Sequence, residues 1–364
     1  MKKRGISTIV AALLVLVIIF AAVAAYGWLR PTTTPTTYTP TTLEEKAYQE
    51  GSLTIYGVMD SPDFVSEFIP DFVEQYPWAT GKINYVGLSP SEISTRALSE
   101  YQAGHVQADV LINTLGTLTS VFVGGAAASY SNPMVALMNY STGTYDPDGF
   151  WQVGFGIPIV VAYNTILVDE AHVPTSWQNL TDSYWNGKIA IDDPKTLNVA
   201  GSLFAHLYPV LGNASWTQLM QGIAANNPVT TESASQSYTK VAQGEVSIAT
   251  GLINDYLSGL GTPGLNVSIA WIEPVTSLPV PTVICKNAPH PNFAKLFIQW
   301  IASAAGQYAV ANTGRVPSHA PIAAGTILAG VLPPGVSIAG VASNNPDYYQ
   351  NPTKWSDTYE SIFG

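Results

Sequence analysis

The sequence predicts an α/β protein in which two units of alternating strands and helices follow each other. The run SLTIYGV is rich in β-formers, and the stretch after it places Phe64, Phe68 and Phe72 four residues apart, as on one face of a helix. A second alternating unit begins with IPIVVAYN at residues 157–164. The 364 residues suffice for about two domains of roughly 150 residues each. We therefore expect two lobes in close contact, with a largely parallel sheet.

The elements of the first unit follow from local signals. Pro70 interrupts the first helix and should kink it. KINYVGL is the second strand, and Ser89 with Glu92 forms a capping box that opens the next helix, with Pro90 in its first turn. ADVLIN, ending at Asn113, is the third strand.

The second unit contains further strands and two longer helices. The predicted strands are IPIVVAYN, KIAIDDP, VSIAT, VSIAW and VPTVIC, and the predicted helices are VAGSLFAHLYPVL and residues 291–304. The last helix carries an apolar stripe that includes Phe293, Phe297 and Trp300, which indicates core packing.

Composition excludes several classes of protein. Apolar residues make up 47% of the chain and charged residues only 11%, which indicates a well-buried body. The formal charge is −11 with 14 basic residues, so nucleic-acid binding is disfavoured because it rests on clustered Lys and Arg. Cys285 is the single cysteine, so no internal disulfide forms.

The N-terminus predicts export and membrane attachment. Basic residues 2–4 precede a charge-free run from Ile6 to Trp28, which as a helix spans ~35 Å at ~1.5 Å per residue. The junction KRGIST resembles an archaeal pilin-type signal cleaved after Gly5, which would leave the apolar run on the mature protein. Cleavage after the small residues 22–24 is the alternative. We assign residues 1–30 to a signal and membrane anchor with its basic end inside the cell.

Residues 31–50, which begin with PTTTPTTYTPTT, are assigned to a Thr/Pro-rich stalk, either a plain tether or an O-glycosylated one. The body is therefore expected on the extracellular face of the cell membrane. Asn-x-Ser/Thr sequons, which favour a glycoprotein, occur at Asn139, Asn179, Asn213 and Asn266.

The motifs of common enzymes are absent from the sequence. It has no G-x-S-x-G, H-E-x-x-H, C-x-x-C or P-loop pattern, and its five histidines are widely spread. Asp192 and Asp193 are adjacent, so on a strand they point to opposite faces, and a turn before Pro194 explains them better than a glycosidase pair. We expect neither catalysis nor a cofactor.

Polar residues gather where strands pass into helices. In an open α/β sheet, ligands bind beyond the carboxyl ends of the strands, where helix N-termini present free N–H groups. Helix capping is the alternative role of each such residue. The candidate ligand-binding residues are Asp60, Ser61, Ser89 and Thr114 in the first unit, and Thr196, Asn198, Ser235, Asn254, Asp255 and Tyr256 in the second.

The order of several motifs resembles one known family. EGSLTIYGVMDSPDFVSEFIPDFVEQYP, SEISTRALSEYQAGHVQADVLIN, GIPIVVAYNTILV, PTSWQNLTDSYWNGKIAIDDP, VAQGEVSIATGLINDY and GQYAVANTGRVP together resemble the extracellular solute-binding proteins of ABC importers, and are most similar to the ferric-iron type (family 1). The resemblance implies a bilobed periplasmic-binding-protein-like (type II) fold, with two doubly wound lobes joined by hinge strands. Lobe 1 would comprise residues 51–157 with about 265–315, and lobe 2 residues 158–264 with about 316–364.

The resemblance also implies a role. The protein would act as a monomer that captures a small solute between its lobes and delivers it to an ABC permease. In the iron-binding relatives two consecutive tyrosines bind ferric iron; Tyr256 matches the first, and Leu257 stands in place of the second. The relatives' histidine falls at Asp60 and their glutamate near Thr114. Of the relatives' metal ligands, Tyr256 and a carboxylate from Asp60 or Asp255 therefore remain, and Tyr256 is the candidate metal ligand.

The solute is expected to be ferric iron with an anion, or another small polar or anionic compound. Tyr56, Tyr101 and Trp151 could stack on a ring, although core packing explains them as well. Two other classes stay open at this point: a pilin-like structural surface protein and a surface hydrolase.

Overall fold

The computed structural model describes the body of the chain. The described residues are 42–58, 64–140, 143–319, 326–336, 338, 345, 347–348 and 351–364. The predicted anchor, most of the predicted stalk, and the candidates Asp60 and Ser61 lie outside them. No helix within the described ranges is both long and apolar enough to cross a membrane.

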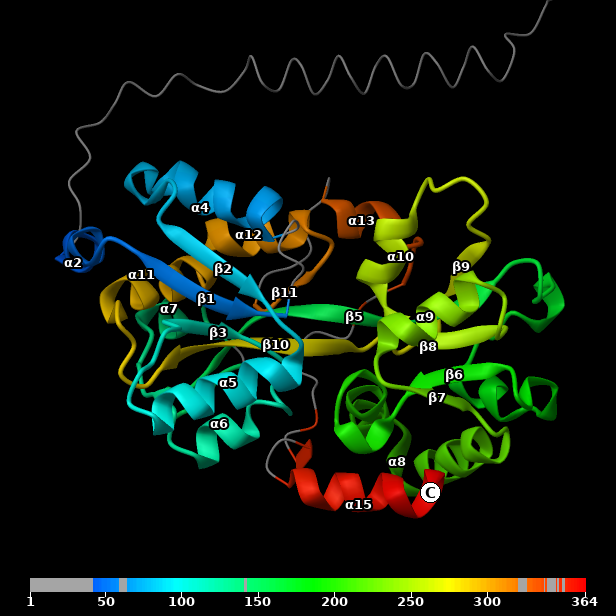
Figure 1. The fold of residues 1–364 in the computed structure, drawn as a ribbon. Helices are drawn as coiled ribbons and strands as arrows, with labels where there is room; N and C mark the ends of the chain where they lie inside the picture. Colours follow the sequence, from blue (N-terminus) through cyan, green and yellow to red (C-terminus); the bar gives the residue numbers. More distant parts are fainter. Residues whose placement is uncertain are drawn as a thin grey trace, which may run out of the picture. The chain divides into compact units, whose positions relative to one another are not determined.

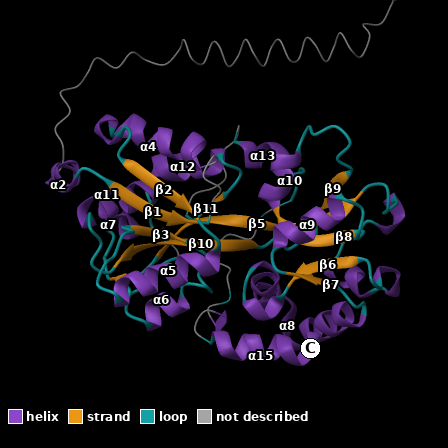
Figure 2. Ribbon diagram, in the orientation of Figure 1, coloured by secondary structure: helices purple, strands orange, loops and turns teal. Residues whose placement is uncertain are grey.

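The strands form one mixed sheet with the order β2-β1-β3-β10-β5-β8-β6-β7, in which β4 pairs with β10 and both β9 and β11 pair with β5 (Figures 1 and 2). Its strands are β1 (Leu53–Gly57), β2 (Ile83–Gly87), β3 (Val110–Ile112), β4 (Ala127–Ala128), β5 (Gln152–Asn164), β6 (Ile189–Asp192), β7 (Val229–Thr231), β8 (Ile248–Leu252), β9 (Val267–Ala270), β10 (Ser277–Cys285) and β11 (Val316–Pro317).

The expectation of a largely parallel sheet is wrong at the centre of the sheet, where the strands pair antiparallel. β1 pairs in parallel with β2 and β3, and β6 with β7 and β8, but β10 and β5 pair antiparallel with all their neighbours. The reason is topological, because β10 returns to the first half of the sheet after the second half is complete, and β5 leaves the first half for the second.

β5 is the strand that both halves share. Its first part, Gln152 to Pro158, pairs with β10, and its second part, Ile159 to Asn164, pairs with β8 and β9. Its residues are buried almost throughout, which explains the nearly continuous apolar run in its sequence. The two halves of the sheet are thus joined through a buried strand.

Helices cover both faces of each half (Figure 1). They are α2 (Thr42–Glu50), α4 (Ile69–Gln75), α5 (Pro90–Gln102), α6 (Thr119–Val123), α7 (Pro133–Leu137), α8 (Val199–Ala225), α9 (Ala234–Ala242), α10 (Ile253–Gly259), α11 (Pro291–Ile301), α12 (Ala304–Asn312), α13 (Ile327–Val331) and α15 (Pro352–Phe363). Shorter 3-10 helices occur at Pro77–Ala79, Glu170–His172, Trp177–Thr181, Ser183–Trp185 and Pro194–Thr196.

The aromatic stripes predicted from the sequence form the core of the first half. The Phe72 ring lies 5.4 Å from the Phe297 ring and 5.2 Å from the Trp300 ring, centroid to centroid. All three side chains are buried. In the second half, Trp216 of α8 contacts Trp355 and Tyr359 of α15, which attaches the C-terminal helix to that half.

Two predicted helix signals are found at their positions. A π-helical turn, Phe64–Phe68, precedes α4, and Pro70 lies in the first turn of α4, so the proline breaks the expected single helix in two. Ser89 and Glu92 form the expected capping box of α5.

Residues 42–50, which the sequence predicts to be part of the stalk, instead form α2, and α2 packs against α11. Glu50 accepts hydrogen bonds from the backbone N–H groups of Asn292 (2.9 Å) and Phe293 (2.8 Å), and so caps the start of α11. Glu44 is 2% exposed and accepts a hydrogen bond from Trp78 Nε1 at 2.7 Å. These contacts make α2 part of the body.

Candidate functional site

The turn that follows β3 holds the candidate Thr114. Asn113 fixes this turn, because its Nδ2 donates to Pro90 O (2.9 Å) and to Ser94 Oγ (3.1 Å), and its Oδ1 accepts from the Thr114 N–H at 2.8 Å. The Thr114 hydroxyl lies 2.9 Å from that of Thr117. Thr114 is thus fixed by hydrogen bonds within its own turn.

The candidate Ser89 caps α5, which is the alternative role that the sequence predicts for it.

The turn that follows β6 is organised by a buried carboxylate. Asp192 accepts hydrogen bonds from the N–H groups of Val199 (3.0 Å) and Ala200 (2.9 Å), the first residues of α8. Burial raises the pKa of Asp192 to about 6, although these two hydrogen bonds act in the opposite direction. Asn198 stands at the N-cap without a capping side chain, and the Thr196 hydroxyl donates to Asp193 O at 2.7 Å. The expectation of free N–H groups for an anion is therefore wrong at α8, because Asp192 already occupies them.

The two turns meet at Gly116 and Leu197. A Cβ atom added to Gly116 would lie 3.0 Å from Leu197 O, closer than side chains normally approach a carbonyl. Leu197 has φ 57°, a left-handed conformation that aims its carbonyl into this contact. The tertiary structure thus brings together the candidates Thr114, Thr196 and Asn198, which belong to different halves of the sheet.

A second group of candidates lies where α9 faces α10. Ser235 Oγ donates to Asp255 Oδ1 at 2.9 Å. Asn254 Oδ1 and the Tyr238 hydroxyl are buried, and neither has a hydrogen-bond partner among the described residues. The pKa of Tyr238 is raised by burial and then by electrostatic interactions with Asp255 and Tyr256. Sequence reasoning missed Tyr238, although it stands three residues after Ser235 on the same helix, a spacing that places both on one face.

Tyr256 and Leu257 pack partly against a small apolar cluster that includes Val160, Ile253 and Val316. Leu257 also lies close to Gly314. Among the described residues, no group of three or more His, Cys, Asp or Glu is placed to hold a metal ion. Tyr256 thus stands next to Asp255, and Leu257 supplies no second, consecutive phenol beside it.

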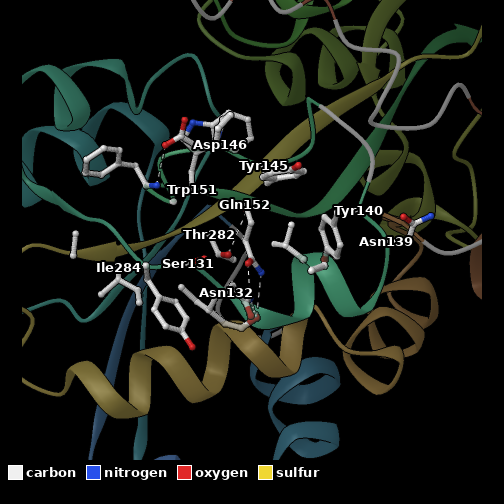
Figure 3. Close-up of a pocket in the computed structure, with 18 residues that line it drawn as sticks. Ser131, Asn132, Asn139, Tyr140, Tyr145, Asp146, Trp151, Gln152, Thr282 and Ile284 are labelled. Carbon is white, nitrogen blue, oxygen red and sulfur yellow. Dashed lines mark hydrogen bonds between the residues drawn. The ribbon is translucent and has the colours of Figure 1, made fainter.

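A separate pocket of about 380 Å³ lies in the first half of the molecule (Figure 3). Its walls come from the loop after β4, from α7, from the segment that leads into β5, and from β10 and α11. None of the candidate site residues lines it, but Trp151 does. Of the other two rings considered for stacking, Tyr56 is buried and donates to Glu100 Oε1 at 2.8 Å, and Tyr101 packs against the apolar core.

The chain matches the model of a known protein family. The model of a family described as bacterial extracellular solute-binding protein matches residues 119–331, which is more than half of the chain. The chain belongs to this family, and it is a binding protein and not an enzyme. The surface-hydrolase and pilin-like alternatives are thereby set aside.

One curated relative matches part of the chain in sequence, and solved structures match its fold. An uncharacterized protein of Haemophilus influenzae (strain ATCC 51907 / DSM 11121 / KW20 / Rd) is 26% identical over 145 residues, and the match spans 37% of this chain and 39% of the relative's length. The ferric binding protein from Campylobacter jejuni matches with a TM-score of 0.67 at 16% identity, over 85% of this chain and 99% of its own.

Two further solved structures match over 86% of this chain at 18% identity. They are iron-bound HitA from Pseudomonas aeruginosa (TM-score 0.64, 99% of its own chain) and AfuA from Actinobacillus pleuropneumoniae with fructose-6-phosphate bound (TM-score 0.63, 98%). The expected bilobed periplasmic-binding-protein fold is thereby confirmed.

Proposed function

We propose that this protein captures a small polar solute between its two lobes and delivers it to a membrane permease of an ABC importer. The observation that carries the proposal is the contact of the Thr114 turn with the Leu197 turn. Each turn follows a strand of a different lobe, and binding proteins of this fold hold solutes where such turns face each other. The solute would lie against these turns and against the polar side chains of α9 and α10.

The chemistry of the proposed site favours a solute that carries hydroxyl or amine donors. Asn254 Oδ1 is a buried acceptor without a described partner, and Asp255 adds a carboxylate beside it. A buried acceptor gains most from a donor that satisfies it, because leaving it unpaired costs about 1–3 kcal/mol. Asp192 occupies the N-terminal amides of α8, which removes an anion site.

Ferric iron is the second candidate solute. The structural neighbours include iron-bound HitA, and Tyr256 lies beside Asp255 in this chain. Leu257 leaves Tyr256 without the second consecutive phenol of the iron-binding pattern, so we rank iron below a neutral polyol or an amine.

A thermal-shift screen of residues 42–364 against polyols, amines, oxyanions and ferric citrate tests the proposal. A true solute at 100 times its Kd should stabilise the protein by about 2.7 kcal/mol.

The variant Asn254→Ala should bind the solute about tenfold more weakly, because the ligand loses one buried hydrogen bond. Asn213→Ala is the matched control, since Asn213 is exposed on α8. Equal losses in the two variants, or no stabilising compound, would contradict the proposed site.

The location of the protein is part of the proposal. Residues 6–28 would anchor it, the basic residues before them would stay inside the cell, and the KRGIST junction would be an archaeal signal. The body would then face the outside, with glycans at the four sequons. The protein would act as a monomer in contact with its permease.

A further inference from the structure

The pocket in the first lobe has the size of a ligand site and a floor that is already fixed. Its volume of about 380 Å³ falls in the range of small-molecule sites. At the floor, Asn132 Nδ2 donates to Gln152 Oε1, and Gln152 Nε2 donates to Ile298 O of α11 at 3.2 Å. Asn132 Oδ1 accepts from the Met134 N–H at 3.0 Å and so caps α7. Both amides are buried, so the floor is formed before any ligand binds (Figure 3).

A tight turn fixes the mouth of the pocket. Asp146 Oδ2 accepts from the Phe150 N–H at 2.9 Å, and the Gly149 N–H donates to Asp146 O at 2.9 Å. Gly149 has φ 79°, and a Cβ there would lie 2.9 Å from Tyr130 O, so this position requires glycine. The Tyr130 N–H in turn donates to Gly149 O at 2.9 Å. The turn is therefore attached to the neighbouring segment.

Aromatic rings form much of the wall. The described lining contains the rings of Tyr130, Tyr140, Tyr145, Phe150 and Trp151. Two neighbours fix the position of Tyr140. Ser318 Oγ donates to its hydroxyl at 3.0 Å, and the His319 ring stacks on its ring with the centroids 4.4 Å apart. Burial lowers the pKa of His319, which keeps that ring neutral near neutral pH. Figure 3 shows Tyr140 and Tyr145 on one side of the pocket, beside Asn132 and Gln152.

The described lining of the pocket carries negative charge and no positive charge. Among the described lining residues, Asp146 is the one carboxylate and none is Lys, Arg or His. The Lys295 Nζ lies 5.5 Å from the Tyr130 ring centroid, but Lys295 is not part of the lining. Aromatic faces and a carboxylate both attract positive charge, and both repel an anion.

We propose that this pocket is a second binding site, distinct from the solute site between the lobes, and that it takes a small organic cation with an ammonium group. The ammonium would lie against the faces of Tyr145 and Trp151 beside the Asp146 carboxylate, and its apolar substituents would fill the rest of the wall. Most donors and acceptors of the Asn132 and Gln152 amides are already used in hydrogen bonds to each other and to the neighbouring helices. Few remain to bind the hydroxyl groups of a sugar, so the pocket is better suited to a cation.

Choline and its neutral isostere 3,3-dimethylbutan-1-ol are the probes that test this inference, with glucose as a third arm. Binding to the full chain in a non-ionic detergent is measured by isothermal titration calorimetry. Choline should bind at least about tenfold more tightly than the isostere, because only the cation gains from the rings and the carboxylate. Equal binding of the two probes, binding of glucose alone, or no binding of choline would each overturn the proposal.

Matched variants locate the site. Asp146→Asn keeps an acceptor for the Phe150 N–H but removes the charge, so it should weaken choline binding about tenfold. Asp148→Asn removes one charge from the same turn at an exposed position outside the lining, and should change the affinity less than about twofold because solvent screens it. Equal effects of the two variants would show that choline responds to net charge alone, and would refute the site.

The same titrations separate this inference from the proposed function. Asn254→Ala should leave choline binding unchanged, and Asp146→Asn should leave unchanged the affinity for any solute found in the thermal-shift screen. If choline binds but no solute is found, the proposed function fails alone. If a solute is found and choline binding is lost in Asn254→Ala, choline occupies the site between the lobes and the second site is refuted.

Discussion

At the scale of single residues, the pair Tyr256-Leu257 separates this chain from the iron-binding pattern that its sequence resembles. Leu257 packs with Tyr256 against an apolar cluster, and this position supplies no oxygen to a metal. Tyr256 remains as a phenol next to Asp255, and Asp255 is already hydrogen-bonded by Ser235. A hydrogen-bonding role for Tyr256 therefore agrees better with its surroundings than a metal-ligating one.

The variant Tyr256→Phe tests that role. It removes one hydroxyl and keeps the ring, so solute affinity should fall by about 0.5–1.5 kcal/mol while stability stays unchanged. Tyr308→Phe is the control, because Tyr308 is 55% exposed on α12. Affinity is measured by calorimetry and stability by urea denaturation.

We also expect no visible charge-transfer band when ferric citrate is added to the native protein. An intense band that disappears in Tyr256→Phe would establish iron ligation instead.

At the scale of elements, α8 shows how one buried carboxylate can organise a turn. Asp192 ends β6 and satisfies the first two amides of α8, so strand and helix are joined by a side chain as well as by the chain. The adjacent Asp193 caps the short helix at Pro194–Thr196 by accepting from the Lys195 N–H at 3.0 Å. Two neighbouring acids that a search for catalytic pairs would select are thus both structural.

The pH dependence of stability should carry the signature of Asp192. Its pKa of about 6 in the folded protein lies above the ordinary 3.8, so the folded state binds the proton first as the pH falls. This group therefore adds stability as the pH decreases from 6 towards 4, by about 1.4 kcal/mol for each unit that separates the two pKa values. Asp192→Asn should lose this gain, and the half-exposed Asp193→Asn should keep it. Urea denaturation at pH 4, 5, 6 and 7 measures both; parallel curves for native protein and Asp192→Asn would contradict the assignment.

At the scale of the whole molecule, residues 42–364 form one compact unit that begins with α2. The contacts of Glu44 and Glu50 connect this first helix to Trp78 and to the start of α11, which lie far along the chain. A soluble form should therefore begin no later than Thr42.

Two truncations test the anchor and the first helix together. Removing residues 1–41 should release the protein from the membrane fraction into the soluble fraction, with the thermal unfolding of the body unchanged. Removing residues 1–50 deletes Glu50 and its cap on α11, so its Tm should fall by several degrees, as expected for a loss of about 1–2 kcal/mol. Fractionation and calorimetry give the two readouts. A full-length protein that is already soluble would argue against the anchor, and equal Tm values would argue against the role of α2.

Much of the fold could be predicted from local sequence. Alternating β-formers and four-residue spacing of aromatics located most strands and helices, and the Ser89-Glu92 box located the start of α5, because these signals depend on residues close in the chain. The antiparallel centre of the sheet could not be predicted in this way, since it depends on where β5 and β10 lie relative to strands far away in sequence.

The candidate site, like the fold, could be predicted only in part from the sequence. The sequence by itself identified polar residues after strands, such as Thr114, Asn198 and Asp255. Its resemblance to the iron-binding proteins predicted that Leu257 stands in place of a second phenol. Only the tertiary structure decided that Gly116 meets Leu197, that Asp192 occupies the amides of α8, and that five rings and Asp146 line one pocket. The physical reason is that residue type sets which interactions a side chain can make, whereas burial and long-range contact decide which of them it does make.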